Sequence, residues 1–257
     1  PYIEKCMAVY TILSASDLEN ILSSYSLGKL QSFEPISSGI ENTNYFLKTK
    51  REELETDWVL TIFENLEVEA LPFFCELTTH LSRAGLSVPA PVRDQVNEFF
   101  FSFEGKAGLI VPRLWGDSVV VPSADDCFQV GVYLAEMHLA VRDFPRRRSL
   151  ERDYDWMEAR RDALEGFVPE ADYQLLVDSL ARYQAYQFEL LECPQGVVHG
   201  DLFRDNVLFH EGQVSGVIDF YHACDATLLF DLAVAANDWA VSSDVCAAGI
   251  VHNTENL

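Results

Sequence analysis

The stretch Val198-His-Gly-Asp-Leu-Phe-Arg-Asp-Asn206, followed by Val217-Ile-Asp-Phe220, decides what this chain folds into and what it can do. Asp201 and Asn206 lie five residues apart between two short apolar runs. Asp219 follows Asn206 by thirteen residues, at the end of an expected hairpin strand. A hairpin between Asn206 and Asp219 brings these two side chains back toward each other. The pattern therefore predicts one carboxylate that handles a hydroxyl, beside an amide and a carboxylate that share a hard cation.

Such a site suits the transfer of a phosphoryl group. Magnesium takes one or two oxygen ligands from the protein and the rest from water and phosphate. Phosphoryl transfer requires mainly positioning and neutralisation of charge. The order of a catalytic Asp, a metal-binding Asn and a metal-binding Asp matches the kinase template. The alternative is that Asp201 and Asp219 are turn or cap residues, as Asp often is. The combined order and spacing favour the phosphotransfer interpretation.

The composition excludes several other classes of protein. The chain has 257 residues, a formal net charge of −23 and 49% hydrophobic residues. That apolar fraction is too high for a disordered chain. An acidic chain lacks the cluster of basic residues with which a protein binds nucleic acid, and its negative surface repels anionic membranes. No run of 18 apolar residues occurs, so we expect no membrane span. We therefore expect a globular protein that binds neither nucleic acid nor anionic membranes.

The cysteines indicate a reducing compartment. They form no CxxC pair, which disfavours a zinc ribbon or a thioredoxin-like site. We expect reduced, buried thiols in a cytoplasmic protein. The six cysteines are Cys6, Cys75, Cys127, Cys193, Cys224 and Cys246.

The first part of the chain is expected to form a small sheet with few helices. Short runs rich in β-branched and aromatic residues predict strands at 44–48, 58–63, 97–103 and 108–111. Helical spacing predicts a short helix from Asp17 to Tyr25 and another that begins near Pro72 and stops before Gly85.

The second part is expected to be mostly helical with an embedded hairpin. A long helix carries Val130 to Val141, and residues 156–192 hold two more helical stretches, divided near Pro169. Strands are predicted at 196–198, 207–209 and 214–220, with Glu211-Gly212 as a tight turn. The result is an α+β fold with an N-lobe at 1–111, a hinge at 112–117 and a helical C-lobe at 118–257.

These motifs resemble a known superfamily. HGDLFRDN followed by IDF resembles the kinase-like phosphotransferases that act on small molecules, such as aminoglycoside phosphotransferases and choline kinases. More specifically, the chain resembles the homoserine kinases of that superfamily over residues 7–239. The supporting stretches are MAVYT at Met7, GIENTNYF from Gly39, VLTIFE from Val59, LPFF from Leu71, VPAP from Val88, RDFP from Arg142, and IDFYHACDATLLFDLAV with NDW ending at Trp239.

The resemblance implies a fold and a reaction. The fold is a two-lobed protein-kinase-like one, with a small antiparallel sheet in the N-lobe. The reaction transfers the γ-phosphate of MgATP to the side-chain hydroxyl of L-homoserine, which gives O-phospho-L-homoserine, a precursor of threonine. Two alternatives stay open. The first is a kinase of another amino alcohol or of an aminoglycoside, and the second is a non-catalytic nucleotide-binding protein.

The resemblance also assigns roles to residues. Asp201 corresponds to the base that accepts or orients the substrate hydroxyl, and Asn206 and Asp219 correspond to the Mg²⁺ ligands. His199 is expected to support the loop and Asp231 to anchor it. The residues that correspond to the ATP site are Gly39, Ile40, Asn42 and Asn44 in the loop over the phosphates, and Val111 and Arg113 in the connector that meets adenine. Gly39 with polar neighbours is alternatively an ordinary hairpin turn.

The substrate side is predicted from the chemistry of homoserine. Its ammonium requires acid or amide oxygens and its carboxylate requires a donor such as arginine. Arg204 is the candidate for the carboxylate or for phosphate. The candidates for the ammonium are Asp205, Tyr221, Asp225, Asn237 and Asp238. Each of these residues is alternatively a surface charge or polar group.

The chain departs from the kinase pattern in two places. Thr61 stands near the position where such kinases usually carry a third-strand lysine, so the contact to the α- and β-phosphates is unassigned. Lys48 on the preceding strand is one candidate for that contact. The family usually continues with further helices after Trp239, and Met7 resembles a natural start. We therefore expect residues 1–6 to be an addition and the C-terminus to be short.

Overall fold

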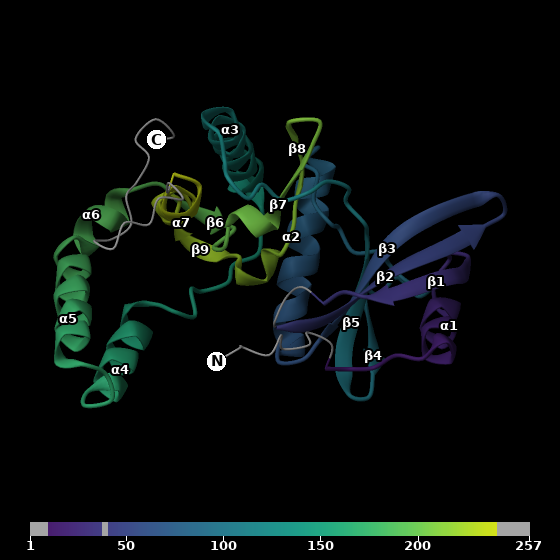
Figure 1. Cartoon of the computed structure of the whole chain (residues 1–257), viewed down its shortest axis with the longest axis horizontal. Coiled ribbons are helices and arrows are strands. Elements are labelled where there is room, and N and C mark those ends of the chain that lie inside the picture. The colour runs from purple at the N-terminus through teal and green to yellow at the C-terminus, as the bar shows by residue number, and fades with distance from the viewer. Residues whose placement is uncertain (1–9, 38–40, 241–257) are drawn as a thin grey trace. The chain divides into compact units, whose positions relative to one another are not determined.

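A computed structural model describes residues 10–37 and 41–240. Figure 1 shows the course of the chain, which divides into two compact units. The first unit holds the residues up to Ser118 together with Val207–Ile218, and the second holds Val119–Asn206 together with the residues from Asp219 onward. The lobe boundaries expected from the sequence stay a prediction.

An antiparallel five-stranded sheet forms the first unit, as Figure 1 shows. The strand order is β1-β2-β3-β5-β4. Along β2, buried and half-buried residues alternate, because successive side chains of a strand point to opposite faces. The strands are β1 (Lys29–Pro35), β2 (Asn42–Arg51), β3 (Leu54–Phe63), β4 (Phe100–Phe103) and β5 (Lys106–Pro112).

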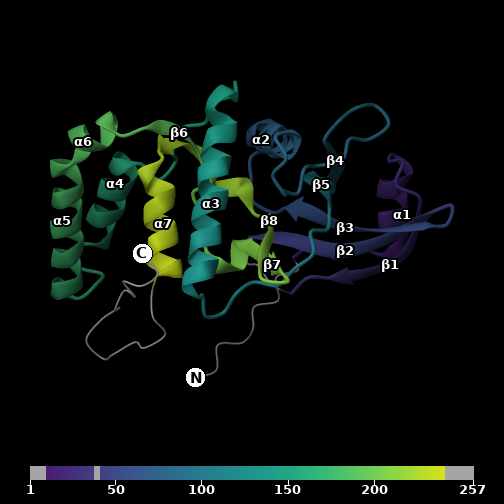
Figure 2. The same cartoon turned by 90° about the horizontal axis from the view of Figure 1, so that it is seen from above.

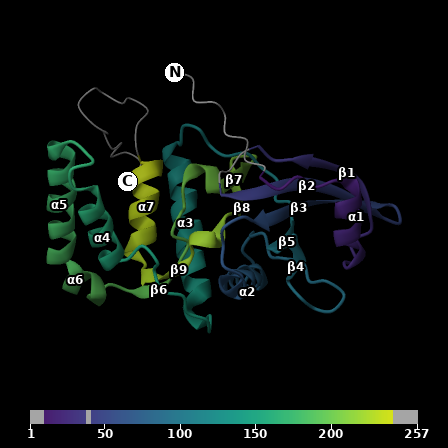
Figure 3. The ribbon, with the colours of Figure 1, turned by 90° about the horizontal axis from the view of Figure 1, so that it is seen from below.

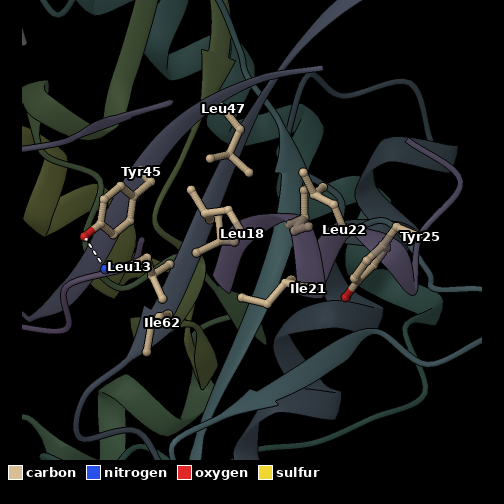
Figure 4. Packing of buried hydrophobic residues seen from close by; sticks show 10 residues of the cluster. Leu13, Leu18, Ile21, Leu22, Tyr25, Tyr45, Leu47 and Ile62 are labelled. Carbon is tan, nitrogen blue, oxygen red and sulfur yellow. Dashed lines mark hydrogen bonds between the residues drawn. The ribbon is translucent and has the colours of Figure 1, made fainter. Parts of the chain in front are cut away.

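Helix α1 (Ala15–Ser23) covers one face of this sheet. It begins at a capping box in which Ser14 and Asp17 satisfy each other's backbone N–H groups. Figure 4 shows its apolar side chains against β2 and β3, where the backbone N–H of Leu13 donates to Tyr45 Oη at 3.0 Å. The buried cluster comprises Leu13, Leu18, Ile21, Leu22, Tyr25, Tyr45, Leu47, Leu60, Ile62 and Ile110.

Two further elements complete the first unit. Helix α2 (Leu71–Arg83) has Pro72 in its first turn, where a missing N–H is tolerated. The hairpin of β7 (Val207–His210) and β8 (Gln213–Val217) turns at two residues with positive φ, Glu211 and Gly212. The turn predicted there is confirmed.

The second unit is mostly helical. Figures 2 and 3 both show α3 lying alongside α7. A two-stranded sheet pairs β6 (Gln195–Val198) with β9 (Cys224–Thr227). The helices are α3 (Ala124–Ala140), α4 (Tyr154–Leu164), α5 (Glu170–Ala185), α6 (Gln187–Glu192) and α7 (Leu229–Trp239).

The α+β class is confirmed, and several boundaries differ from expectation. Strands β1 and β9 were not predicted, because neither sequence shows a clear apolar alternation. Residues 156–192 hold parts of three helices, since a break at Tyr186 separates α5 from α6. The strand expected at 214–220 ends at Val217. Within the described residues, no helix is both long and apolar enough to cross a membrane.

The described cysteines, Cys75, Cys127, Cys193 and Cys224, are free thiols. Cys75 and Cys224 are buried, and Cys127 and Cys193 are only partly so. Burial raises the pKa of Cys75 to about 12 and that of Cys224 to about 11. Both thiols are therefore protonated at neutral pH, which makes them packing residues rather than nucleophiles.

Candidate active site

The loop between β6 and β7, residues 199–206, holds two of the three residues predicted to carry the chemistry. The Asn206 amide nitrogen donates to Asp201 Oδ2 at 3.0 Å and to the Asp201 backbone oxygen at 2.8 Å. Asn206 is buried, whereas Asp201 is partly exposed. Both hydrogen bonds use the amide nitrogen, so the amide oxygen Oδ1 of Asn206 is left as an acceptor.

Asp219 follows the hairpin that begins directly after Asn206. Pairing of Val207 with Val217 brings the two ends of the hairpin side by side. Asn206, which precedes the hairpin, and Ile218, which follows it, are therefore next to paired residues. Asp219 is exposed and has a left-handed backbone, with φ 62° and ψ 60°. This conformation, which Asp tolerates better than most residues, ends the extended strand before Asp219.

Local geometry fixes the start of the loop. The Asp201 backbone N–H donates to His199 Nδ1 at 3.2 Å, and the fully buried His199 ring lies 4.5 Å from the Phe220 ring. The supporting role expected for His199 is thus confirmed. Gly200 has φ 81°, and a Cβ there would lie 2.7 Å from the His222 backbone oxygen. Position 200 therefore requires glycine.

Asp231, on α7, anchors this loop as predicted. It is fully buried, and its Oδ2 and Oδ1 accept the backbone N–H groups of His199 and Gly200, each at 2.8 Å. Its Oδ2 also lies 2.8 Å from Nε2 of His138 on α3. This contact joins residues 93 positions apart in the sequence, so no local pattern predicts it.

The far end of α7 holds the same loop. Asp238 accepts the backbone N–H of Arg204 at 2.7 Å, and its two oxygens accept Arg204 Nε at 3.1 Å and Nη2 at 3.0 Å. Trp239 Nε1 donates to the backbone oxygen of Leu202 at 3.0 Å. One helix therefore bonds to the loop backbone from both of its ends. The seven-residue spacing of Asp231 and Asp238, two helical turns, is the sequence signal for this arrangement.

The donor set suits a hard cation of the magnesium type. Asn206 Oδ1 and the Asp219 carboxylate offer oxygen atoms, which Mg²⁺ prefers over nitrogen or sulfur. Among residues 10–37 and 41–240, no group of three or more His, Cys, Asp or Glu side chains could hold a metal ion. A magnesium site with few protein ligands is consistent with that finding, because Mg²⁺ keeps several waters and binds phosphate oxygens.

The residues predicted to bind nucleotide lie in the first unit. Thr61 Oγ1 donates to Asn44 Oδ1 at 2.7 Å across the pairing of β2 with β3. Val111 is buried in β5. The Arg113 guanidinium carbon lies 3.9 Å above the Phe46 ring centroid. Asn42 begins β2 and is partly exposed, and Gly39 and Ile40 lie outside the described residues.

Lys48, considered for the phosphate contact, lies next to acids instead. Its Nζ is 3.7 Å from Asp57 Oδ1 and 3.8 Å from Glu55 Oε2. It is also four residues further along β2 than Asn44, which is about 13 Å in an extended strand. The contacts of Lys48 therefore favour a solvent-facing ion pair.

Several of the residues considered for substrate binding are engaged with other protein groups. Arg204 and Asp238 pair with each other, and Asp225 Oδ2 accepts the backbone N–H of Arg148 at 2.7 Å. Asp225 Oδ1 also lies 3.5 Å from Arg147 Nε. Asp205 and Asn237 are exposed and Tyr221 is partly exposed. Substrate-binding roles for all six residues stay predictions.

Comparison with known proteins identifies the family of the chain. The sequence pattern of the phosphotransferase enzyme family matches residues 32–253. A homoserine kinase of Neisseria meningitidis serogroup B is 41% identical over 238 residues, which are 93% of this chain and 76% of that protein. A homoserine kinase of Burkholderia multivorans is 43% identical over 246 residues, covering 91% of this chain and 73% of that protein.

Solved structures show the same fold. An amicoumacin kinase in complex with AMP-PNP and Ca²⁺ superimposes with a TM-score of 0.64 at 18% identity, over 84% of this chain and 66% of that one. A spectinomycin phosphotransferase in complex with ADP and spectinomycin gives 0.60 at 12% identity, over 86% and 73%. The expected fold class is confirmed. The chain belongs to the phosphotransferase enzyme family and, within it, to the homoserine kinases.

Proposed function

We propose that this protein transfers the γ-phosphate of MgATP to the side-chain hydroxyl of L-homoserine and releases O-phospho-L-homoserine. The observation that carries the proposal is the identity of about 41–43% with homoserine kinases over more than nine tenths of the chain. The geometry of the loop at residues 199–206 supports the same chemistry, because the Asn206 amide nitrogen holds the Asp201 carboxylate and leaves the Asn206 amide oxygen as an acceptor.

Asp201 is the proposed catalytic residue. Its Oδ2 accepts the Asn206 amide, which fixes the carboxylate and leaves Oδ1 to accept the hydrogen bond of the substrate hydroxyl. As that hydroxyl oxygen forms its bond to phosphorus, its proton passes to Asp201. The bond from phosphorus to the leaving oxygen of ADP breaks in the same transfer.

Asn206 and Asp219 are the proposed Mg²⁺ ligands, through one amide oxygen and one carboxylate. When bound, Mg²⁺ neutralises negative charge on the phosphate oxygens. The Asn206 amide is fixed by its two bonds to Asp201. Any displacement of the catalytic carboxylate therefore also moves the proposed amide ligand.

The proposed nucleotide contacts come from the first unit, and the division into an N-lobe, a hinge at 112–117 and a C-lobe is part of this proposal. For the substrate, the exposed side chains of Asp205 and Asn237 are proposed to bind the ammonium group of homoserine. The proposed contacts to ATP are Gly39, Ile40, Asn42, Asn44, Val111 and Arg113.

A panel of acceptors tests the function. The purified protein is supplied with MgATP and, in turn, L-homoserine, choline, ethanolamine and kanamycin, and ADP release is measured in a coupled assay. We expect L-homoserine to give a kcat/KM at least about a hundredfold above the others, because an acceptor without the carboxylate leaves its binding groups unpaired. Preference for an amine without a carboxylate would replace homoserine as the substrate. Nucleotide binding without turnover of any acceptor would favour a non-catalytic protein.

A further inference from the structure

The third strand of the sheet carries a threonine where a kinase of this kind usually carries a lysine. Thr61 is buried in β3, directly opposite Asn44 of β2. Both side chains lie on the sheet face opposite to the one that packs on α1, because the residues on either side, Tyr45, Leu60 and Ile62, belong to the α1 cluster. The pair therefore lies on the other side of the sheet from the α1 cluster.

Nearby cations are engaged elsewhere. Lys48 neighbours Asp57 and Glu55, as described above. Lys106 of β5 forms an ion pair with Glu64 and donates to Thr11 Oγ1 at 2.8 Å. Because both lysines pair with acids, neither takes the role of the usual third-strand lysine in this structure.

The hydrogen bond between Thr61 and Asn44 fixes how the Asn44 amide is oriented. Thr61 Oγ1 donates to Asn44 Oδ1 at 2.7 Å, so the oxygen end of the amide is used inside the sheet. The nitrogen end makes one long contact, 3.4 Å to the Asn42 backbone oxygen. An amide nitrogen carries two N–H donors, and that single contact leaves donor capacity on this side.

We propose that Thr61 is a positioning residue that holds the Asn44 amide nitrogen as a donor to a phosphate oxygen of the bound nucleotide. A neutral, oriented amide would then act where related kinases use a cation. The inference rests on the proposed function, because it takes the ligand to be a nucleotide. Asparagine side chains are ordinary donors to phosphate oxygens.

A purely structural role for the pair makes a different prediction. Hydroxyl and amide side chains that face each other across two strands also stabilise a sheet. In that case the loss of the Thr61 hydroxyl lowers stability without a specific effect on phosphate binding. The two roles are separated by comparing a nucleotide with its nucleoside, since only the nucleotide carries phosphate.

The experiment measures the Kd of MgATP and of adenosine by calorimetry for the unaltered protein and four variants. Thr61→Val removes the hydroxyl at nearly constant volume, Thr61→Ser keeps it, and Asn44→Ala removes the donor. Thr49→Val is the matched control, because Thr49 is a buried threonine on β2 whose hydroxyl is also bonded, to Leu27 O at 2.7 Å. Thermal unfolding is recorded for each variant.

We expect Thr61→Val and Asn44→Ala to weaken MgATP binding about tenfold, the usual size of a hydrogen bond to a charged group. Adenosine binding should be unchanged, Thr61→Ser should bind MgATP as the unaltered protein does, and Thr49→Val should lose stability only. The role of Thr61 is refuted, while the proposed function stands, in either of two cases in which the unaltered protein binds MgATP. In the first, Thr61→Val and Asn44→Ala bind MgATP as tightly as the unaltered protein does. In the second, their binding of adenosine falls in parallel with their binding of MgATP. If the unaltered protein does not bind MgATP, both fail.

Discussion

At the scale of single residues, Asp201 bears most of the proposed chemistry. Asp201→Asn keeps an oxygen that can accept the Asn206 amide but removes the negative charge that receives the proton. We expect kcat with homoserine to fall about a thousandfold, within the range typical of a lost general base, and MgATP binding to change little. Steady-state kinetics and calorimetry measure the two quantities.

A matched control for this change is Asp172→Asn, on the exposed surface of α5. We expect that variant to keep full turnover. A kcat for Asp201→Asn within a few fold of the unaltered protein would show that another group positions or deprotonates the hydroxyl.

Asp231 is the residue on which the shape of the loop depends. Asp231→Ala leaves the buried N–H groups of His199 and Gly200 without an acceptor and removes the partner of His138. We expect the free energy of unfolding to fall by about 3–5 kcal/mol, because each buried polar group left without its partner costs about 1–3 kcal/mol. Urea unfolding measures it, with Asp178→Ala on the surface of α5 as the control. A loss below about 1 kcal/mol, the size of a single ordinary hydrogen bond, would contradict the anchoring role.

Glu64 makes stability depend on pH. Burial alone would raise the pKa of its carboxyl, but the hydrogen bond from Lys106, those from Thr43 and Thr11, and the charge of Lys106 outweigh burial and lower the pKa below its ordinary value. In the unfolded chain a glutamate titrates near about pH 4.3. The ionised group therefore stabilises the folded state above that pH, and this contribution is lost as the pH falls through it toward the lower folded pKa.

The measurement compares urea unfolding of the unaltered protein and Glu64→Gln between about pH 6 and pH 3, the range that brackets the ordinary pKa of glutamate. We expect the stability difference between the two proteins to be largest at pH 6 and to shrink at acid pH. A constant difference across this range would mean that Glu64 titrates in the folded protein as it does in the unfolded chain.

At the scale of elements, α7 connects the fold to the site. Asp231, Asp238 and Trp239 lie on one face of this helix and bond to the loop backbone at four positions. The ordered loop positions Asp201. A change in how α7 packs against the loop should therefore lower turnover rather than weaken substrate binding.

Asp238→Asn tests that view. It weakens the paired bonds to the Arg204 guanidinium while it keeps an acceptor for the Arg204 backbone. We expect kcat to fall about tenfold, the usual cost of one lost charge-assisted bond, with the KM for homoserine unchanged. If KM rises tenfold at constant kcat, Asp238 instead binds the substrate ammonium, as the sequence alone had suggested.

The elements show which features the sequence could predict. Strands β2 and β3 and helix α2 were predicted because their apolar periodicity is strong. Strand β9 was missed because Cys224–Thr227 becomes a strand only by pairing with β6. The anchoring role of Asp231 was expected from the resemblance. Its contact with His138 joins residues 93 positions apart, and no local pattern predicts it.

At the scale of the whole molecule, the order of motifs along the chain was more informative than its composition. The net charge of −23 argued against nucleic-acid partners but identified no partner. The loop and hairpin from His199 to Asp219 pointed to a phosphotransferase, because the order and spacing of Asp201, Asn206 and Asp219 match the kinase template. The left-handed backbone of Asp219 and the pairing of Arg204 with Asp238 became visible only in three dimensions.

The transfer of phosphate to homoserine is tested most directly by ³¹P NMR of a reaction that contains the protein, MgATP and L-homoserine. We expect a phosphomonoester signal that splits by coupling to the γ-carbon protons of homoserine and grows in step with ADP, and that is almost absent with Asp201→Asn. ADP that accumulates with inorganic phosphate alone, or a phosphomonoester that the Asp201→Asn variant forms at the same rate, would contradict the proposed reaction.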